Sequence, residues 1–294
     1  MYYRRRFILA LLHTHGGTLD RLRLMKLLLL ALKDRPVLLF SFVPYKFGAY
    51  SFQATQDLRA LVAHGVLSQA ENDWQLKDTT DHLAVLSADD RSRIERTAQR
   101  YATWKTRDII HESYRLLPQT AVRSAMASDL LSREELQAVE ATKPKPSAPG
   151  LYTIGYEGLD IDAFLNKLLG AGITLLCDVR RNAQSMKYGY SKKQLEKYCN
   201  SAGIRYLHRS ALGIASEKRK ELNSPEAYQT LFAEYAKRYL PEVVYEQENL
   251  LFDVQMEHRV AIMCFEADPA CCHRSHLAGS LAELSADKLP VYHL

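Results

Sequence analysis

The chain has 294 residues, of which 47% are hydrophobic and 25% are charged, and its formal net charge is +5. This length predicts about two domains, and the composition excludes a disordered, collagen-like or coiled-coil protein. The apolar run 27–32 is far too short to span a membrane. Five cysteines without a regular spacing favour a reducing, cytoplasmic location.

Positive charge is concentrated near the N-terminus. Residues 1–150 carry 22 Lys and Arg against 16 Asp and Glu, whereas residues 151–294 carry 17 against 18. The first 50 residues alone carry 9 against 2. Such a concentration is commonly used to neutralise phosphates, because released counterions drive the binding of nucleic acid. The alternative is a solvated basic face on an ordinary domain.

A linker is expected at residues 143–150, KPKPSAPG, because three prolines and no large apolar residue are typical of an exposed connection. Residues 1–142 before it are predicted to be mainly helical. The segment 1–17 weakly resembles a signal peptide, but His13 and His15 interrupt its apolar run and no cleavage site follows, so we expect a helix of the folded protein.

Apolar spacing predicts three helices in the first domain. The first stops at Gly16-Gly17, the second is capped by Thr18 and interrupted by Pro36, and the third ends at Gly65. An ordered loop or turn is expected over 43–51, a β-hairpin over 66–76, and further helix over 89–139.

Three helices followed by a hairpin are the order of a winged helix-turn-helix. The segments RLRLMKLLLLALK (21–33), PYKFGAYS (44–51) and LRALVAHGVL (58–67) resemble winged-helix domains related to the Panacea and SocA-like antitoxin families. This resemblance implies a module that binds DNA or another protein. We expect nucleic acid, and DNA in particular, as the partner, with docking to a protein as the alternative.

Residues 151–294 alternate apolar strands with helices. Strands are predicted at 151–155, 173–177, 204–207, 259–265 and 289–294, and helices at 159–169, 191–201, 225–240 and 272–284, with a longer excursion from Arg209 to Ser224. This alternation predicts a parallel α/β sheet with its ligand site at the carboxyl edge of the strands.

Polar residues follow four of these strands and are expected to meet at that edge. Asp178 and Glu266 come directly after buried strands, where a carboxylate is costly without a role or a partner. They are candidates for nucleophile and acid/base. Alternatively, they form structural ion pairs with Arg180 and Arg274.

The segment CCHRS (271–275) lies at a predicted helix start, where N–H groups favour an anion. Arg274 is expected to bind a phosphate or carboxylate through two hydrogen bonds. The positive field of the helix start is expected to lower the pKa of Cys272 and make it a nucleophile. The alternative is a small buried cysteine. Cys264, Cys272, His273 and His276 suit a metal, but no second paired cluster accompanies them. No metal or cofactor is therefore predicted, and metal binding by Cys264, Cys272 and His276 is left open.

The second half resembles the domain-of-unknown-function 488 family through YTIGYEG (152–158), LLCDVRRNAQSMKYGYSKKQL (175–195), GIRYLHRSALGI (203–214), the stretch 223–241 and MCFEADPACCHRS (263–275). The resemblance implies a Rossmann-like fold and a pocket built from these motifs, without an activity. The pairing with a winged-helix half resembles a recurring arrangement in this family. One departure is Ala183, where the family usually has proline.

Two functions are considered. In the first, the second domain is an enzyme, a hydrolase or transferase acting on a nucleic acid or nucleotide at a phosphate-binding cleft. In the second, it senses a small anionic ligand and the first domain is a regulated DNA binder. The expected catalytic residues are Glu266, Cys272, Asp178 and His273, and the expected phosphate- or substrate-binding residues are Tyr156, Arg180, Arg181, Ser185, Lys187, His208 and Arg274. No membrane partner is expected, and the sequence is compatible with a homodimer.

Overall fold

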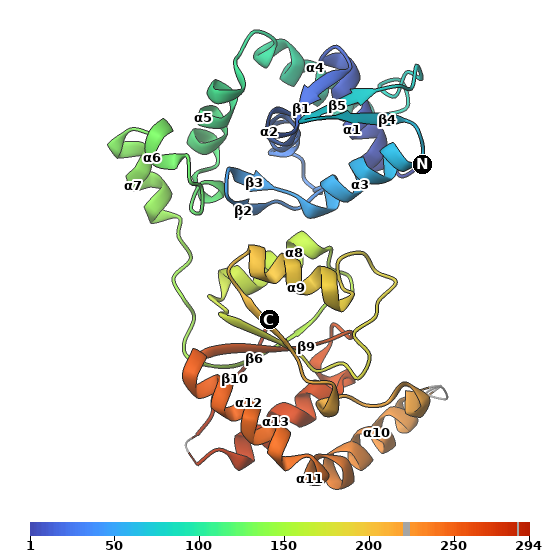
Figure 1. Ribbon diagram of the computed structural model, residues 1–294, viewed down its shortest axis with the longest axis vertical. Coiled ribbons are helices and arrows are strands. Elements are labelled where there is room, and N and C mark those ends of the chain that lie inside the picture. The colour runs from blue at the N-terminus through green and yellow to red at the C-terminus, as the bar shows by residue number, and fades with distance from the viewer. Residues whose placement is uncertain (220–223, 287) are drawn as a thin grey trace. The chain divides into compact units, whose positions relative to one another are not determined.

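The computed structural model describes residues 1–219, 224–286 and 288–294. The chain forms two compact units, Met1–Lys143 and Pro144–Leu294 (Figure 1). The boundary lies inside the segment 143–150. Each unit has its own hydrophobic core.

The N-terminal unit begins with α1 (Tyr3–Thr14), β1 (Thr18–Asp20), α2 (Arg21–Leu32), β2 (Val43–Tyr45), β3 (Gly48–Tyr50), α3 (Phe52–Ala63), β4 (Leu67–Ala70) and β5 (Asp73–Leu76). Strands β1, β5 and β4 form an antiparallel sheet in that order. The unit continues with α4 (Ala88–Tyr101), α5 (Thr106–Leu116), a 3₁₀ turn at Pro118–Thr120, α6 (Ala127–Leu130) and α7 (Arg133–Ala141).

The predicted elements of this unit are close to those observed, with two differences. Thr18 lies in β1, and Asp20 caps α2 instead by accepting a hydrogen bond from the backbone N–H of Arg23 at 2.8 Å. The segment 43–51 is a short hairpin of β2 and β3 rather than a loop. Its Gly48 has φ +83°, and a Cβ there would lie 2.3 Å from the Tyr114 ring, so both the turn and the packing require glycine.

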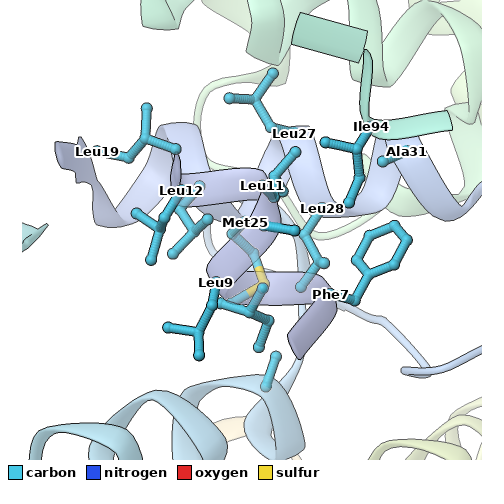
Figure 2. Close-up of a cluster of buried hydrophobic side chains, with 14 of the residues drawn as sticks. Phe7, Leu9, Leu11, Leu12, Leu19, Met25, Leu27, Leu28, Ala31 and Ile94 are labelled. Atoms are coloured by element: carbon cyan, nitrogen blue, oxygen red, sulfur yellow. The ribbon is translucent and has the colours of Figure 1, made fainter. Parts of the chain in front are cut away.

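The core of the N-terminal unit is built around α1 and α2, whose apolar side chains interlock in Figure 2. Residues 7–12 of α1 are all 0% exposed, which makes it a helix buried on every side in its middle turns. The prediction that segment 1–17 forms a helix of the folded protein is therefore confirmed. Among the described residues, no helix has the length and apolarity required to cross a membrane.

The C-terminal unit is a parallel α/β structure, as predicted. Its strands are β6 (Gly150–Gly155), β7 (Leu175–Asp178), β8 (Arg205–His208), β9 (Arg259–Cys264) and β10 (Val291–His293). They pair in the order β10-β6-β9-β7-β8, and every pair is parallel. All residues of β6 and β7 are buried, as expected for strands covered on both faces.

Helices cover both faces of this sheet. Figure 1 shows α8 (Ile161–Gly170) and α9 (Lys192–Ser201) on one face, and α12 (Val244–Glu257) and α13 (His273–Leu284) on the other. The neighbouring strands β7 and β9 lead into helices on opposite faces. Their connections therefore diverge, which opens a crevice at their carboxyl ends where ligands of open α/β sheets bind.

The long connection from β8 to β9 contains 3₁₀ turns at Ser210–Leu212 and Ser216–Arg219, helix α10 (Pro225–Glu234), a π-helical segment at Tyr235–Tyr239, the short α11 (Leu240–Glu242) and α12. Residues 220–223 of the predicted excursion lie outside the described residues. Helix α12 was not predicted, because its buried residues are Gln247, Leu250 and Val254 and this mixed set gives a weak apolar pattern.

Candidate functional site

A cavity of about 150 Å³ opens at the carboxyl ends of β6, β7 and β9, the place that the sheet topology marks. Its wall consists of Tyr156, Arg180, Arg181, Asn182, Gln184, Ile214, Cys264 and Phe265. Tyr156 and Phe265 contact each other edge to face, with ring centroids 5.3 Å apart. The cavity thus combines two arginines and two amides with aromatic rings.

A second cavity of about 80 Å³ shares Arg181 and Ile214 with the first and is otherwise mainly apolar. The Tyr235 and Tyr239 rings in its wall stack with centroids 5.8 Å apart. Gly213 lies in the wall of the second cavity, and a Cβ there would lie 2.2 Å from the backbone nitrogen of Arg181. Only glycine allows the loops after β7 and β8 to approach so closely.

Asp178 and Arg180 form a buried ion pair below the first cavity. Asp178 is 0% exposed, and its carboxylate accepts from Arg180 Nε at 2.8 Å, Arg180 Nη2 at 2.6 Å and the Tyr206 hydroxyl at 2.7 Å. Arg180 also donates to the Tyr156 hydroxyl at 3.0 Å and to the carbonyl of Tyr190 at 2.8 Å. This arrangement favours the structural alternative considered for Asp178 over an acid/base role.

Arg181 differs from Arg180 in being exposed. Its Nη1 donates to the carbonyl of Ser210 at 3.4 Å, a long contact, and its side chain lies in the walls of both cavities. Arg181 is therefore the cation best placed to bind an anion between them.

Three of the predicted binding residues organise the loops around the cavity. Ser185 exchanges hydrogen bonds with Ser191 at 3.0 and 3.1 Å. Lys187 donates to the carbonyl of Tyr156 at 2.9 Å, and burial lowers its pKa. His208 contacts the carbonyl of Arg180 through Nε2 at 2.9 Å. None of the three lies in the wall of either cavity.

Arg274 holds the loop between β9 and α13. It is 1% exposed and donates to the carbonyls of Glu266 at 2.6 Å and Ala267 at 2.9 Å. Gly155 lies against the same loop, since a Cβ there would be 1.7 Å from the Glu266 carbonyl oxygen. Glu157 accepts from the Ala267 backbone N–H at 3.0 Å. This geometry gives Arg274 a structural task, and anion binding by it stays a prediction.

The rigid loop brings Cys272 and His273 to Cys264 at the end of β9. His273 Nδ1 lies 3.7 Å from Cys264 Sγ and 3.8 Å from Cys272 Sγ, and all three side chains are 0–1% exposed. Burial raises the pKa of Cys272, the neighbouring Cys264 and then Glu266 act in the same direction, and Arg274 opposes them. The predicted lowering of that pKa is therefore wrong, because desolvation outweighs the helix start.

The structure thus brings some of the expected site residues together and separates others. Tyr156, Arg180 and Arg181 lie in the cavity wall with Cys264, which stands next to Cys272 and His273. His276 instead packs against Phe232, and burial lowers its pKa. The site prediction missed Asn182, Gln184 and Phe265 as wall residues, although all three stand within the motifs 175–195 and 263–275.

Much of the basic charge of the N-terminal unit is used internally. Arg4 and Arg5 pair with the buried Asp57, and Arg35 pairs with Asp90 at 3.0 Å. Lys26 is 1% exposed, donates to the carbonyl of Ala49 at 2.8 Å, and has its pKa lowered to about 7 by burial.

A cavity of about 500 Å³ beside α2, β2 and β3 is lined by three basic residues and one acidic residue, Asp20. Arg21, Lys26 and Lys46 lie in its wall together with Tyr45, Phe47 and Tyr50. Arg21 also covers the Trp74 ring at 5.7 Å. This cavity is the part of the unit best suited to an anionic partner with flat rings.

Residues 160–281 match the family described as Domain of unknown function DUF488, so the C-terminal half is similar to that family, as predicted. The matched range covers α8, β7, the cavity walls after β7 and β9, and most of α13. No curated protein and no solved structure matches the chain. The description of the family names no activity.

Proposed function

We propose that the chain is a nucleic-acid-associated protein whose C-terminal unit acts enzymatically on a nucleotide or a nucleic acid, as a hydrolase or transferase. The observation that carries this proposal is the position of Arg181 between two cavities of different chemistry. If Arg181 binds a phosphate, the group attached to one side of that phosphate would contact the amides of Asn182 and Gln184. An apolar ring would fit against Tyr235 and Tyr239 on the other side.

The chemistry is proposed at the Cys264 side of the polar cavity. Asp178 is engaged by Arg180 and Tyr206, so it is assigned to the scaffold. Cys264, Cys272 and His273 adjoin the cavity through Cys264, and Glu266 follows in the same loop. These residues, rather than Asp178, are the candidates to take part in bond breaking.

For the N-terminal unit we propose a winged-helix module that binds nucleic acid. The order α1-β1-α2-β2-β3-α3-β4-β5, in which the β2-β3 hairpin is inserted between α2 and α3, and the sheet order β1-β5-β4 support this proposal. Arg21 and Lys46 in the wall of the basic cavity support contact with phosphates. Replacing Lys46 by alanine should weaken binding to an oligonucleotide and reduce its salt dependence, whereas Arg96→Ala on α4 should change neither. A flat salt response of the wild type would favour docking to a protein.

The proposal for the C-terminal unit is tested by measuring binding of nucleoside mono-, di- and triphosphates and short oligonucleotides to the full chain. Arg181→Ala should weaken the best ligand by about 10–100-fold, because one charge-assisted contact contributes about 1.5–3 kcal/mol. Lys193→Ala removes an equal charge from the exposed face of α9 and should leave binding unchanged. Equal losses of ligand affinity in Arg181→Ala and Lys193→Ala, or no loss in either, would refute Arg181 as part of the binding site.

The sensor function is the second candidate, because the buried Cys272 thiol with its raised pKa resembles a structural group as much as a nucleophile. It predicts the same effect of Arg181→Ala on binding but no chemical change in the ligand. The two functions therefore separate on turnover, not on affinity.

A further inference from the structure

The strongest unexplained feature of the C-terminal unit is the cluster of Cys264, Cys272 and His273. It is the one group of three potential metal-binding side chains found in residues 1–219, 224–286 and 288–294. Its ligand atoms all lie within 4.8 Å of one another, although the residues come from the end of β9 and the start of α13. From these distances we infer that the cluster binds Zn²⁺ through the two sulfur atoms and Nδ1 of His273.

The distances fit a tetrahedral zinc ion. With Zn–S of about 2.3 Å and Zn–N of about 2.0–2.1 Å, tetrahedral geometry puts each sulfur about 3.5–3.6 Å from the nitrogen. The observed separations from Nδ1 are 3.7 Å for Cys264 and 3.8 Å for Cys272. The two sulfurs lie within 4.8 Å of each other, and a tetrahedral site with these bond lengths needs about 3.8 Å between them.

The ring of His273 has the orientation that is typical of a metal-binding histidine. Its Nε2 lies 3.3 Å from the carbonyl of Val179, so this nitrogen carries the proton and donates it, while the lone pair of Nδ1 points towards the sulfurs. A single lone pair accepts a good hydrogen bond from one thiol, yet two sulfurs lie at nearly equal distances from it. A cation shared by all three atoms would use the same convergence of two sulfurs and one nitrogen that the hydrogen bonds among these groups show.

The loop that presents Cys272 and His273 is held in place independently of the cluster. Arg274 binds the carbonyls of Glu266 and Ala267, and Glu157 binds the N–H of Ala267. Such outer supports fix the directions of the ligands. Two thiolates and a neutral imidazole also balance the charge of Zn²⁺, so the occupied site is neutral and suited to burial.

Three protein ligands leave a fourth position, as in zinc sites that keep a water or a substrate group. Cys264 is at once a ligand and part of the wall of the polar cavity, and we assign the fourth position to that side. The inference does not depend on the proposed function, because metal uptake is measured without any nucleic acid.

The test uses the full chain, purified under reducing conditions, stripped of metal and titrated with Co²⁺ and then with Zn²⁺. We expect one metal ion per chain, thiolate-to-cobalt charge-transfer absorption, and the visible spectrum of tetrahedral Co²⁺. X-ray absorption of the zinc form should show two sulfur neighbours at about 2.3 Å. Absence of thiolate bands, or a zinc shell without sulfur, would overturn the inference, and both measurements need only the wild type.

Matched variants locate the metal. Cys264→Ala, Cys272→Ala and His273→Ala should each weaken Co²⁺ binding by more than the 10–100-fold that loss of an outer partner typically costs. Cys271→Ala, next to the cluster, Cys199→Ala, buried in α9, and His276→Ala should retain the metal. Retention of the wild-type spectrum in Cys264→Ala or Cys272→Ala, with folding checked by circular dichroism, would contradict the assignment.

Discussion

Asp178 and Arg180 show how two residues of the expected site act on the fold rather than on a ligand. Their side chains are 0% and 7% exposed, and Asp178 accepts from four donor atoms of Arg180 and Tyr206. Asp178→Asn leaves the buried guanidinium without its counterion, so it should reduce the free energy of unfolding by about 3–5 kcal/mol in urea denaturation. Glu257→Gln, which breaks the exposed pair with Arg205, should cost less than about 1 kcal/mol. Similar losses of unfolding free energy in Asp178→Asn and Glu257→Gln would show that the buried ion pair stabilises the fold no more than the exposed one.

Lys26 gives a prediction of pH dependence. Its pKa is about 7 in the folded state, against about 10.4 in the unfolded chain. Below pH 7 both states are protonated and the cost of the buried charge is fully present. As the pH rises from 7 towards 10, only the unfolded state retains the proton, so stability should increase by up to about 1.4 kcal/mol per pH unit.

Lys26→Met should remove this contribution, whereas the exposed Lys77→Met should keep it. Urea denaturation of the three proteins between pH 6.5 and 9.5 measures the difference. Parallel curves for wild type and Lys26→Met would mean that the buried amine does not titrate in this range.

At the scale of elements, the approach of β6 to the loop between β9 and α13 is the most demanding contact of the site. A methyl group on Gly155 would overlap the carbonyl of Glu266 at 1.7 Å. Gly155→Ala should therefore destabilise the chain by more than about 1 kcal/mol and displace Cys272 and His273 from Cys264. Gly279→Ala in α13 meets no atom within 4 Å and should stabilise by about 0.5–1 kcal/mol. Thermal unfolding of both variants tests this contrast, which fails if Gly155→Ala is neutral.

Element order was predictable from the sequence where the apolar pattern was strong, as in residues 7–12 of α1 and the buried strands β6, β7 and β9. The prediction failed at α12, where Gln247 is one of three buried residues. The cluster of Cys264, Cys272 and His273 was only partly predictable. Spacing along the chain placed all three at the carboxyl edge, but whether His273 or His276 faces the sulfurs depends on the turn before α13.

The partners of charged side chains were likewise not predictable from the sequence. Counting basic residues pointed to the N-terminal unit, but a count does not show that Arg4 and Arg5 share the carboxylate of Asp57 or that Lys26 is buried. These pairings join residues more than 20 positions apart and arise only from tertiary packing. The proposed contacts to a nucleic acid are Arg21 and Lys46 in the cavity wall.

At the scale of the whole molecule, the two units have separate cores, so each is expected to fold alone. Fragments 1–143 and 144–294 should each unfold in one cooperative transition, and the second should retain binding to the best ligand of the full chain. Calorimetry and circular dichroism of the fragments measure this. Loss of cooperative unfolding in either fragment would mean that the units depend on each other.

The central claim, that the C-terminal unit is an enzyme acting on a nucleotide or nucleic acid, is tested most directly by product analysis. The wild type, Glu266→Gln and Cys272→Ala are incubated with nucleotides and with single- and double-stranded DNA and RNA, and the products are identified by mass spectrometry. We predict a strand break, a released base or phosphate, or a new adduct with the wild type, and its loss in the variants while ligand binding survives. Unchanged substrates with ligand binding intact would contradict the enzymatic function and leave the sensor function as the remaining candidate.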